Sequence, residues 1–361
     1  MLTRLRPLIP RLSHRQAASR RLVTLVAAVS FVAVPLVGAG CSTTGEPAAS
    51  SVAPDTTTAP AAPLPTVAVT YSVLASVVRE LVDGVADVVT IVPDGVDPHD
   101  FEPSARDVET LTNADFIVAN GLHFESGLDS ALEQLREAGR PIFYAIDHVT
   151  ARLISTDDDG HDHGAEHSDE HGDEHGDEHG DSKDGAVDGD GHDHGAIDVH
   201  LWTSPATLVD MVAPLAAELG TALSVDFTAA ATDLTAALNA LDSEILDAMA
   251  TIPNCELVTG HNELGYFAER YGCELVGTVI PSSTTTAEAS AGQLAELKKV
   301  IAERSAPVIF TSLGTPRAVA DQIARESGVQ VVELSTHVMG DAGSYGEFMR
   351  RLAATIVGAL A

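Results

Sequence analysis

Four histidines follow similar apolar segments in the sequence, and their imidazole side chains could bind a metal ion. Each follows a strand-like apolar run or a short turn after one: they are His99, His200, His261 and His337. Because ligands of open α/β sheets bind outside the carboxyl ends of the strands, we expect the four side chains to gather there. Four imidazole nitrogens satisfy a tetrahedral Zn²⁺ ion. The pattern predicts a metal site that suits Zn²⁺, Cu, Ni or Co better than Mn²⁺ or Mg²⁺.

The framework predicted around these histidines alternates strands with helices. Short apolar runs predict strands over residues 67–70, 88–92, 116–119 and 142–145, and again over 256–259, 274–279, 308–311 and 329–334. Amphipathic stretches predict helices over residues 72–81, 127–138, 263–271, 292–303 and 315–326. Four strand–helix alternations, occurring twice, are typical of parallel sheets in two α/β lobes. Facing lobes would bring His99 and His200 opposite His261 and His337.

A long run with few helix breakers lies between the predicted lobes, over residues 224–251. Its apolar positions recur at helical spacing: they are Leu234, Leu238, Leu241, Ile245 and Leu246. At about 1.5 Å per residue this helix would be roughly 40 Å long. We therefore predict an α/β fold with an N-terminal lobe over residues 66–223 and a C-terminal lobe over 252–361. Each lobe holds a parallel (β/α)4 sheet, one long rigid helix joins them, and the metal site lies between them.

The first 65 residues are interpreted as an export signal and a tether. Six arginines precede an apolar run over residues 22–37, which is shorter than the about 20 residues that a spanning helix needs. Residues 1–40 therefore read as a signal. The small residues before Cys41 resemble a bacterial lipobox, whose cysteine is lipidated; the alternative is a plain signal peptide with an incidental cysteine. Residues 41–65 are rich in Ser, Thr, Ala and Pro, which is typical of a flexible tether.

Two of the three cysteines lie in the predicted C-terminal lobe. Cys255 and Cys273 each begin a strand-like run, with one helical segment between them, so they could lie side by side at a sheet edge. An oxidising compartment outside the cytoplasm favours a disulfide between them over two buried thiols.

The charge of the chain excludes some partners. The formal net charge is −33, so the phosphates of nucleic acids or of an anionic membrane surface would be repelled. Apolar residues make up 45% of the chain, which is enough to bury a sizeable core.

Much of the acidity lies in residues 157–194, where the unit E-H-(G/S)-D repeats. Eight histidines lie among its carboxylates: His161, His163, His167, His171, His175, His179, His192 and His194. With no apolar period, the segment is predicted to be a solvated loop. Its chemistry is that of a weak, multivalent collector of divalent metal. We expect its deletion to lower metal stoichiometry and to leave one tight site intact.

Several motifs, in order, resemble one family. DGVDPHDFEPSARDVETLTNADFIVANGLHFES, AIDVHLWTSP, TGHNELGYFAERYG and IPSSTTTAEASAGQLAELKKVI are similar to segments of the metal-binding solute-binding proteins of ATP-binding-cassette importers, zinc branch. The resemblance covers about residues 66–361 and implies His99, His200 and His261 as ligands. AIDVHLWTSP lacks the first Pro and final Asp of its family motif. Zinc relatives carry a His/Asp/Glu-rich loop where this chain has residues 157–194, and manganese relatives generally lack it.

The fourth ligand departs from the family pattern. Relatives often place Asp or Glu after the last strand, whereas ELSTHVMGDAG places His337 there. We therefore expect His337 as the ligand, with Asp341 as the alternative. His123 lies in the NGL segment and His148 has no strand context, and neither is expected to bind.

The resemblance implies a binding protein rather than an enzyme. We expect an extracytoplasmic, membrane-anchored monomer that captures Zn²⁺ as cargo and delivers it to a membrane permease with its ATPase. Binding should release protons and weaken as pH falls through about 6.5. The alternatives are a manganese or iron receptor, an adhesin of the same fold, or a zinc hydrolase with Glu102, Glu125 or Glu263 as base.

Overall fold

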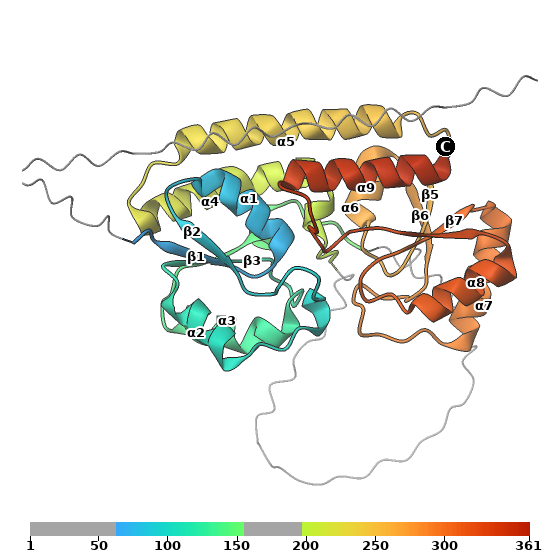
Figure 1. The fold of residues 1–361 in the computed structure, drawn as a ribbon, viewed down its shortest axis with the longest axis horizontal. Helices are drawn as coiled ribbons and strands as arrows, with labels where there is room; N and C mark the ends of the chain where they lie inside the picture. Colours follow the sequence, from blue (N-terminus) through green and yellow to red (C-terminus); the bar gives the residue numbers. More distant parts are fainter. Residues whose placement is uncertain (1–62, 155–196) are drawn as a thin grey trace, which may run out of the picture. The chain divides into compact units, whose positions relative to one another are not determined.

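The computed structural model describes residues 63–154 and 197–361, which belong to one compact unit, Ala61–Ala361 (Figure 1). Two parallel four-stranded sheets form its framework. The first has the order β2-β1-β3-β4 and the second the order β6-β5-β7-β8, so the two repeat one topology. The strands are β1 (Thr66–Val69), β2 (Asp87–Thr90), β3 (Phe116–Ala119), β4 (Ile142–Tyr144), β5 (Glu256–Thr259), β6 (Glu274–Thr278), β7 (Val308–Thr311) and β8 (Gln330–Glu333). The predicted two-lobed parallel α/β fold is confirmed.

Helices surround both sheets. They are α1 (Ser72–Val82), α2 (Ala105–Asn113), α3 (Asp129–Glu137), α4 (Pro205–Leu223), α5 (Thr228–Met249), α6 (Gly265–Tyr271), α7 (Ala291–Arg304), α8 (Arg317–Ser327) and α9 (Tyr345–Leu360). Short 3₁₀ turns are η1 (Pro98–Asp100), η2 (Ser126–Leu128), η3 (Ala145–His148) and η4 (Leu201–Thr203). We call the first sheet with α1–α4 the first lobe, and the second sheet with α6–α8 the second lobe.

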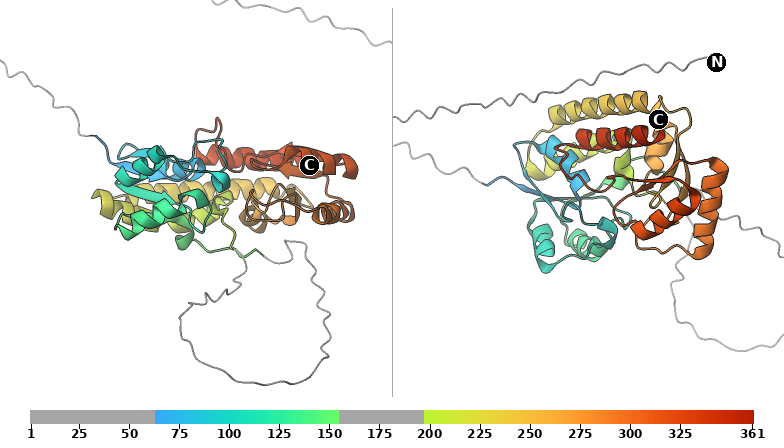
Figure 2. Two further views of the ribbon diagram at one scale, coloured as in Figure 1. Left: turned by 90° about the horizontal axis from the view of Figure 1, so that it is seen from below. Right: turned by 45° about the vertical axis from the view of Figure 1, so that its right-hand side comes forward.

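One long helix contacts elements of both lobes, and a second packs beside it. α5 contacts α1 and α4 of the first lobe and α6 of the second, and α9 packs on α5 and α1 (Figures 1 and 2). α5 begins at Thr228, not at residue 224 as predicted. The reason is that Ser224 ends α4 in the left-handed conformation, with φ 56°, and its N–H is bonded to Gly220. α5 therefore contacts both lobes, and α9, which follows the second lobe in the chain, packs on α5 and on α1 of the first lobe.

The segment before His200 differs from the prediction. Ile197 forms no strand of the sheet; it makes an isolated antiparallel bridge with Leu153, and the Asp198 N–H donates to the Arg152 carbonyl at 2.9 Å. The apolar run before His200 is strand-like in sequence and yet belongs to no sheet, because the same pattern also suits a short buried connection. His200 is instead the residue directly before η4.

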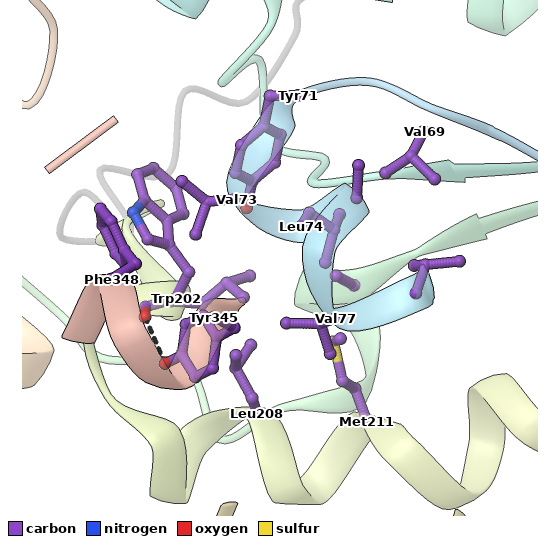
Figure 3. Packing of buried hydrophobic residues seen from close by; sticks show 14 of the residues in the cluster. Val69, Tyr71, Val73, Leu74, Val77, Trp202, Leu208, Met211, Tyr345 and Phe348 are labelled. Carbon is purple, nitrogen blue, oxygen red and sulfur yellow. Dashed lines mark hydrogen bonds between the residues drawn. The ribbon is translucent and has the colours of Figure 1, made fainter. Parts of the chain in front are cut away.

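The main core passes from one lobe to the other. Buried side chains of α1, η4, α4 and α9 pack together, among them Leu74, Trp202, Met211 and Phe348 (Figure 3). The Tyr345 hydroxyl donates to the Trp202 carbonyl at 2.7 Å. α4 is long and apolar enough to cross a membrane, but its buried residues belong to this core. This shared core fixes the positions of the elements from which the loops between the lobes extend.

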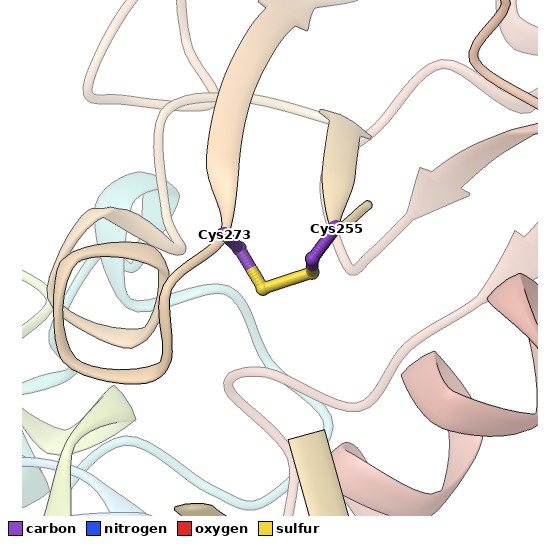
Figure 4. Close-up of a disulfide and its surroundings, with 2 residues drawn as sticks. All are labelled: Cys255 and Cys273. Atoms are coloured by element: carbon purple, nitrogen blue, oxygen red, sulfur yellow. A yellow bond between two sulfur atoms is a disulfide. The ribbon is translucent and has the colours of Figure 1, made fainter. Parts of the chain in front are cut away.

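A disulfide joins Cys255 and Cys273, with their Cα atoms 4.5 Å apart (Figure 4). The two cysteines directly precede β5 and β6, and β6 is the edge strand of the second sheet. The bridge therefore ties the starts of two neighbouring strands.

Candidate metal centre

Four buried imidazoles meet between the lobes. His99, His200, His261 and His337 each offer one ligand atom, and these atoms all lie within 4.8 Å of one another. His200 Nε2 lies 3.3 Å from His99 Nε2 and 3.2 Å from His261 Nε2. A tetrahedral Zn²⁺ ion with bonds of about 2.0–2.1 Å holds its ligand nitrogens about 3.3 Å apart. His337 Nε2 is buried without a hydrogen-bond partner, so the residues present fit a divalent metal of this size.

His99 is positioned by the turn that precedes it. η1 begins with Pro98, and the Asp97 side chain accepts the His99 N–H at 3.0 Å, which caps the turn. The other Asp97 oxygen accepts the Thr285 hydroxyl of the second lobe at 2.7 Å. Phe124 packs edge-on against the His99 ring, with centroids 4.9 Å apart. The backbone and the ring of this histidine are therefore both fixed.

His200 is held by the residue two places before it. Asp198 is fully buried, and its Oδ1 accepts the His200 N–H at 3.0 Å and lies 2.9 Å from His200 Nδ1. Its Oδ2 faces the Arg152 guanidinium at 3.4 Å. A carboxylate on Nδ1 fixes the tautomer that leaves the Nε2 lone pair free for a metal.

His261 and His337 come from the carboxyl ends of β5 and β8. β5 lies where the strand order of its sheet reverses, which is the usual ligand position in an open α/β sheet. Glu263 lies behind both imidazoles: its Oε1 is 3.8 Å from His261 Nδ1, and its Oε2 is 3.5 Å from His337 Nδ1. The hydroxyl of Thr336 lies between this carboxylate and His337, 2.9 Å from His337 Nδ1.

Burial changes the pKa of several groups here. Burial, followed by the proximity of His200, lowers the pKa of His99 to about 3. The same two causes, with further histidines, lower the pKa of His261 and His337 well below the usual value. These three imidazoles are therefore neutral near pH 7, as metal ligation requires. Protons compete for them at lower pH than the 6.5 expected from the sequence.

The other predicted candidates lie elsewhere. Asp341, the alternative fourth ligand, lies in the turn that follows His337. It is a partner of Arg351 with a side chain 90% exposed, and it is not in the histidine group. His123 is exposed and lies 2.6 Å from Asp129, and His148 stacks on Phe143 at 4.3 Å. Of the candidate bases, Glu102 is exposed.

Some predicted residues lie outside the described part of the chain. These are Cys41 and the loop histidines His161, His163, His167, His171, His175, His179, His192 and His194. The sequence analysis did not identify Asp198 and Thr336, the partners behind the ligands, and it considered Glu263 only as a candidate base. The spacing D-x-H at Asp198 and H-x-E at Glu263 was a signal for two of them.

Fold and site together define a two-lobed α/β protein that presents four interior imidazoles to a metal ion. The family model described as zinc-uptake complex component A, periplasmic (ZnuA), matches residues 67–359, and the chain belongs to this family.

Individual relatives agree with this family. The chain is 29% identical over 309 residues to "Zinc-binding protein TroA" of Treponema pallidum (strain Nichols), covering 82% of this chain and 89% of that protein. It is 27% identical over 262 residues to "Zinc-binding protein AdcA" of Streptococcus pyogenes serotype M3 (strain ATCC BAA-595 / MGAS315), covering 71% of this chain. It spans 47% of that relative's length.

Solved structures share the fold. The periplasmic zinc binding protein TroA from Treponema pallidum superposes with a TM-score of 0.64 at 26% identity, covering 82% of this chain and 99% of that one. FpvC from Pseudomonas aeruginosa in complex with Mn²⁺ gives a TM-score of 0.63 at 24% identity, covering 82% and 98%. At that identity FpvC supports the fold alone.

Proposed function

We propose that this chain is the extracytoplasmic substrate-binding component of an ATP-binding-cassette transporter, which captures Zn²⁺ and delivers it to a membrane permease. The observation that carries the proposal is the group of four buried imidazoles, His99, His200, His261 and His337. The Nε2–Nε2 distances of 3.2 and 3.3 Å suit a tetrahedral ion. Family membership and the names of the zinc-binding relatives support the same cargo.

The donor set favours binding over catalysis. Four protein ligands close the coordination sphere of Zn²⁺, whereas a catalytic site keeps one position for water. Glu263 lies at the Nδ1 side of His261 and His337, 3.8 and 3.5 Å from these nitrogens, and therefore behind the rings rather than beside a water on a metal bound by the Nε2 atoms. Glu125 accepts the Asn120 N–H and is buried. The site therefore suits an ion that is carried unchanged.

Release of the ion calls for movement of loops. The loop before His99 is fastened to the loop after His337: Asp94 accepts the N–H groups of Met339 and Gly340, each at 2.8 Å. Because α5 contacts both lobes and α9 packs on α5 and α1, we expect these loops to separate while the lobes stay nearly fixed. The permease would draw the ion out by binding the opened loops.

The remaining parts of the chain fit this role. Cys41 would anchor the protein to the membrane through lipid, and residues 157–194 would collect Zn²⁺ near the tight site. We expect a monomer that works with a permease and its ATPase. Deletion of residues 160–194 should lower the number of weakly bound ions and leave one tight site.

Competition between Zn²⁺ and Mn²⁺ for the purified protein tests the proposal. We expect one tight Zn²⁺ site that Mn²⁺ does not displace at equal concentration, and loss of that site in H200A. H123N is the matched control, because His123 is an exposed histidine outside the group. Equal affinity for Mn²⁺, or a tight site that survives H200A, would contradict the proposal.

A further inference from the structure

The ligand group of this protein holds no carboxylate, since all four donors are imidazoles. Neutral imidazoles leave the full charge of a divalent ion in a buried site, and a buried charge is costly unless an opposite charge lies nearby. Two buried carboxylates, Asp198 and Glu263, stand directly behind the rings. Asp198 also faces the Arg152 guanidinium at 3.4 Å, so part of its charge is already balanced.

Glu263 is fixed in place by two hydroxyl groups. The Ser312 hydroxyl donates to Oε1 at 2.6 Å, and the Thr336 hydroxyl donates to Oε2 at 2.5 Å. Within the described ranges, the basic side chains within 4 Å of this carboxylate are the imidazoles of His261 and His337. The carboxylate therefore faces the metal ligands of the second lobe.

The hydroxyl of Thr336 links the Glu263 carboxylate to the His337 ring. A hydroxyl has one proton to donate, and Thr336 donates it to Glu263. Its oxygen must therefore accept from His337 Nδ1, 2.9 Å away. With the proton on Nδ1, the lone pair of His337 lies on Nε2, the buried nitrogen without a hydrogen-bond partner. Thr336 thus fixes the tautomer of His337, as Asp198 fixes the tautomer of His200.

We infer that Glu263 is a positioning and specificity-determining residue of the zinc site: through Thr336 it fixes the tautomer of His337, and its charge makes the all-imidazole site prefer a divalent ion over a monovalent one. This inference rests on the proposed zinc-binding function. Glu263 touches no metal; it acts through the ligands.

The affinities of E263Q and wild type for Zn²⁺ and Cu⁺ separate the effect of the Glu263 charge from the effect of its side-chain shape. Gln keeps the size of the side chain and cannot carry the negative charge that a bound divalent ion would favour on Glu263. Outer carboxylates typically contribute about 10–100-fold in metal affinity, so we expect the Zn²⁺ affinity of the tight site to fall by at least about 10-fold. Cu⁺ carries half the charge and should lose much less, so the ratio of Zn²⁺ to Cu⁺ affinity falls. Chelator competition under anaerobic conditions with ascorbate measures both ions.

E125Q is the matched control, because Glu125 is a buried carboxyl that accepts a backbone N–H of the first lobe. It should retain the wild-type ratio. Unchanged Zn²⁺ affinity in E263Q, or an equal fall for both ions, would overturn the inference. Absence of a tight Zn²⁺ site in wild type would instead overturn the proposed function.

T336V keeps the carboxyl group of Glu263 and removes the hydroxyl that joins it to His337. This variant tests the link from Glu263 to His337 even when E263Q does not fold. Nitrogen NMR of the metal-free protein should show His337 of wild type with its proton on Nδ1. In T336V the proton should be shared between both nitrogens. A proton on Nε2 in wild type, or the same tautomer in T336V and wild type, would overturn the assignment.

Discussion

A methyl group at Gly265 should weaken zinc binding, although this residue is not a ligand. Gly265 begins α6 in the second lobe, directly against the partners of His200. A Cβ at this position would lie well inside contact distance of Asp198 Oδ2 and of the Arg152 guanidinium. Asp198 is fully buried and cannot swing into solvent. G265A must therefore displace the carboxylate that orients His200.

The size of the effect follows from the contacts of Asp198. Its Oδ1 holds both the N–H and Nδ1 of His200, at 3.0 and 2.9 Å. Loss of the partner behind a ligating histidine typically costs about 10–100-fold in metal affinity, which corresponds to about 1.4–2.8 kcal/mol. We expect G265A to weaken the tight site by this amount.

The assay is Zn²⁺ titration against a competing chelator, with urea unfolding of the metal-free protein measured in parallel. G358A is the matched control, since a Cβ at Gly358 in α9 meets nothing within 4 Å. It should leave zinc affinity unchanged and stabilise the protein by about 0.5–1 kcal/mol. Wild-type zinc affinity in folded G265A would refute the positioning of His200 by Asp198.

Three further changes have defined outcomes. H337D should raise affinity for Mn²⁺ relative to Zn²⁺ by about 10-fold, because carboxylate oxygen suits harder ions; competition titration would contradict this if the ratio did not move. Replacing Cys255 and Cys273 by Ser opens a bridge of sequence separation 18 and should lower the free energy of unfolding by about 3 kcal/mol, which urea denaturation measures; an unchanged midpoint would argue against the bridge. Because His99 has a native pKa of about 3 and an unfolded one near 6.5, the unfolded chain binds more protons below pH 6.5. Wild type should therefore lose about 2 kcal/mol relative to H99N between pH 7.5 and 5 in chelator, and a constant difference would contradict the lowered pKa.

The fold was predictable because buried strands can be recognised from a few neighbouring residues in the sequence. β3, β5 and β7 have the predicted bounds, since each is a short apolar run between polar turns. α4 was not among the predicted helices; it contains Pro214, which reads as a helix breaker. α4 is nevertheless stable, because its apolar face is buried in the shared core.

Of the metal site, only the four histidine ligands could be predicted from the sequence; the residues that hold them could not. Four histidines after apolar runs were visible in the sequence, and the structure brings all four together. The link from Glu263 to Thr336 joins residues 73 positions apart, and only the folded second lobe brings them within hydrogen-bond distance. Sequence spacing has no means of indicating such a pair. The strand-like run before His200 is a similar case, because Ile197 pairs with Leu153, 44 positions earlier in the sequence, and not with a strand of the sheet.

Diffraction at the zinc absorption edge tests the central claim most directly. Crystals of protein loaded with one equivalent of Zn²⁺ should give one strong anomalous peak between the lobes. It should be bounded by the Nε2 atoms of His99, His200, His261 and His337, at about 2.0–2.1 Å from each. A peak outside this group, or a water or carboxylate oxygen in place of one imidazole, would contradict the account.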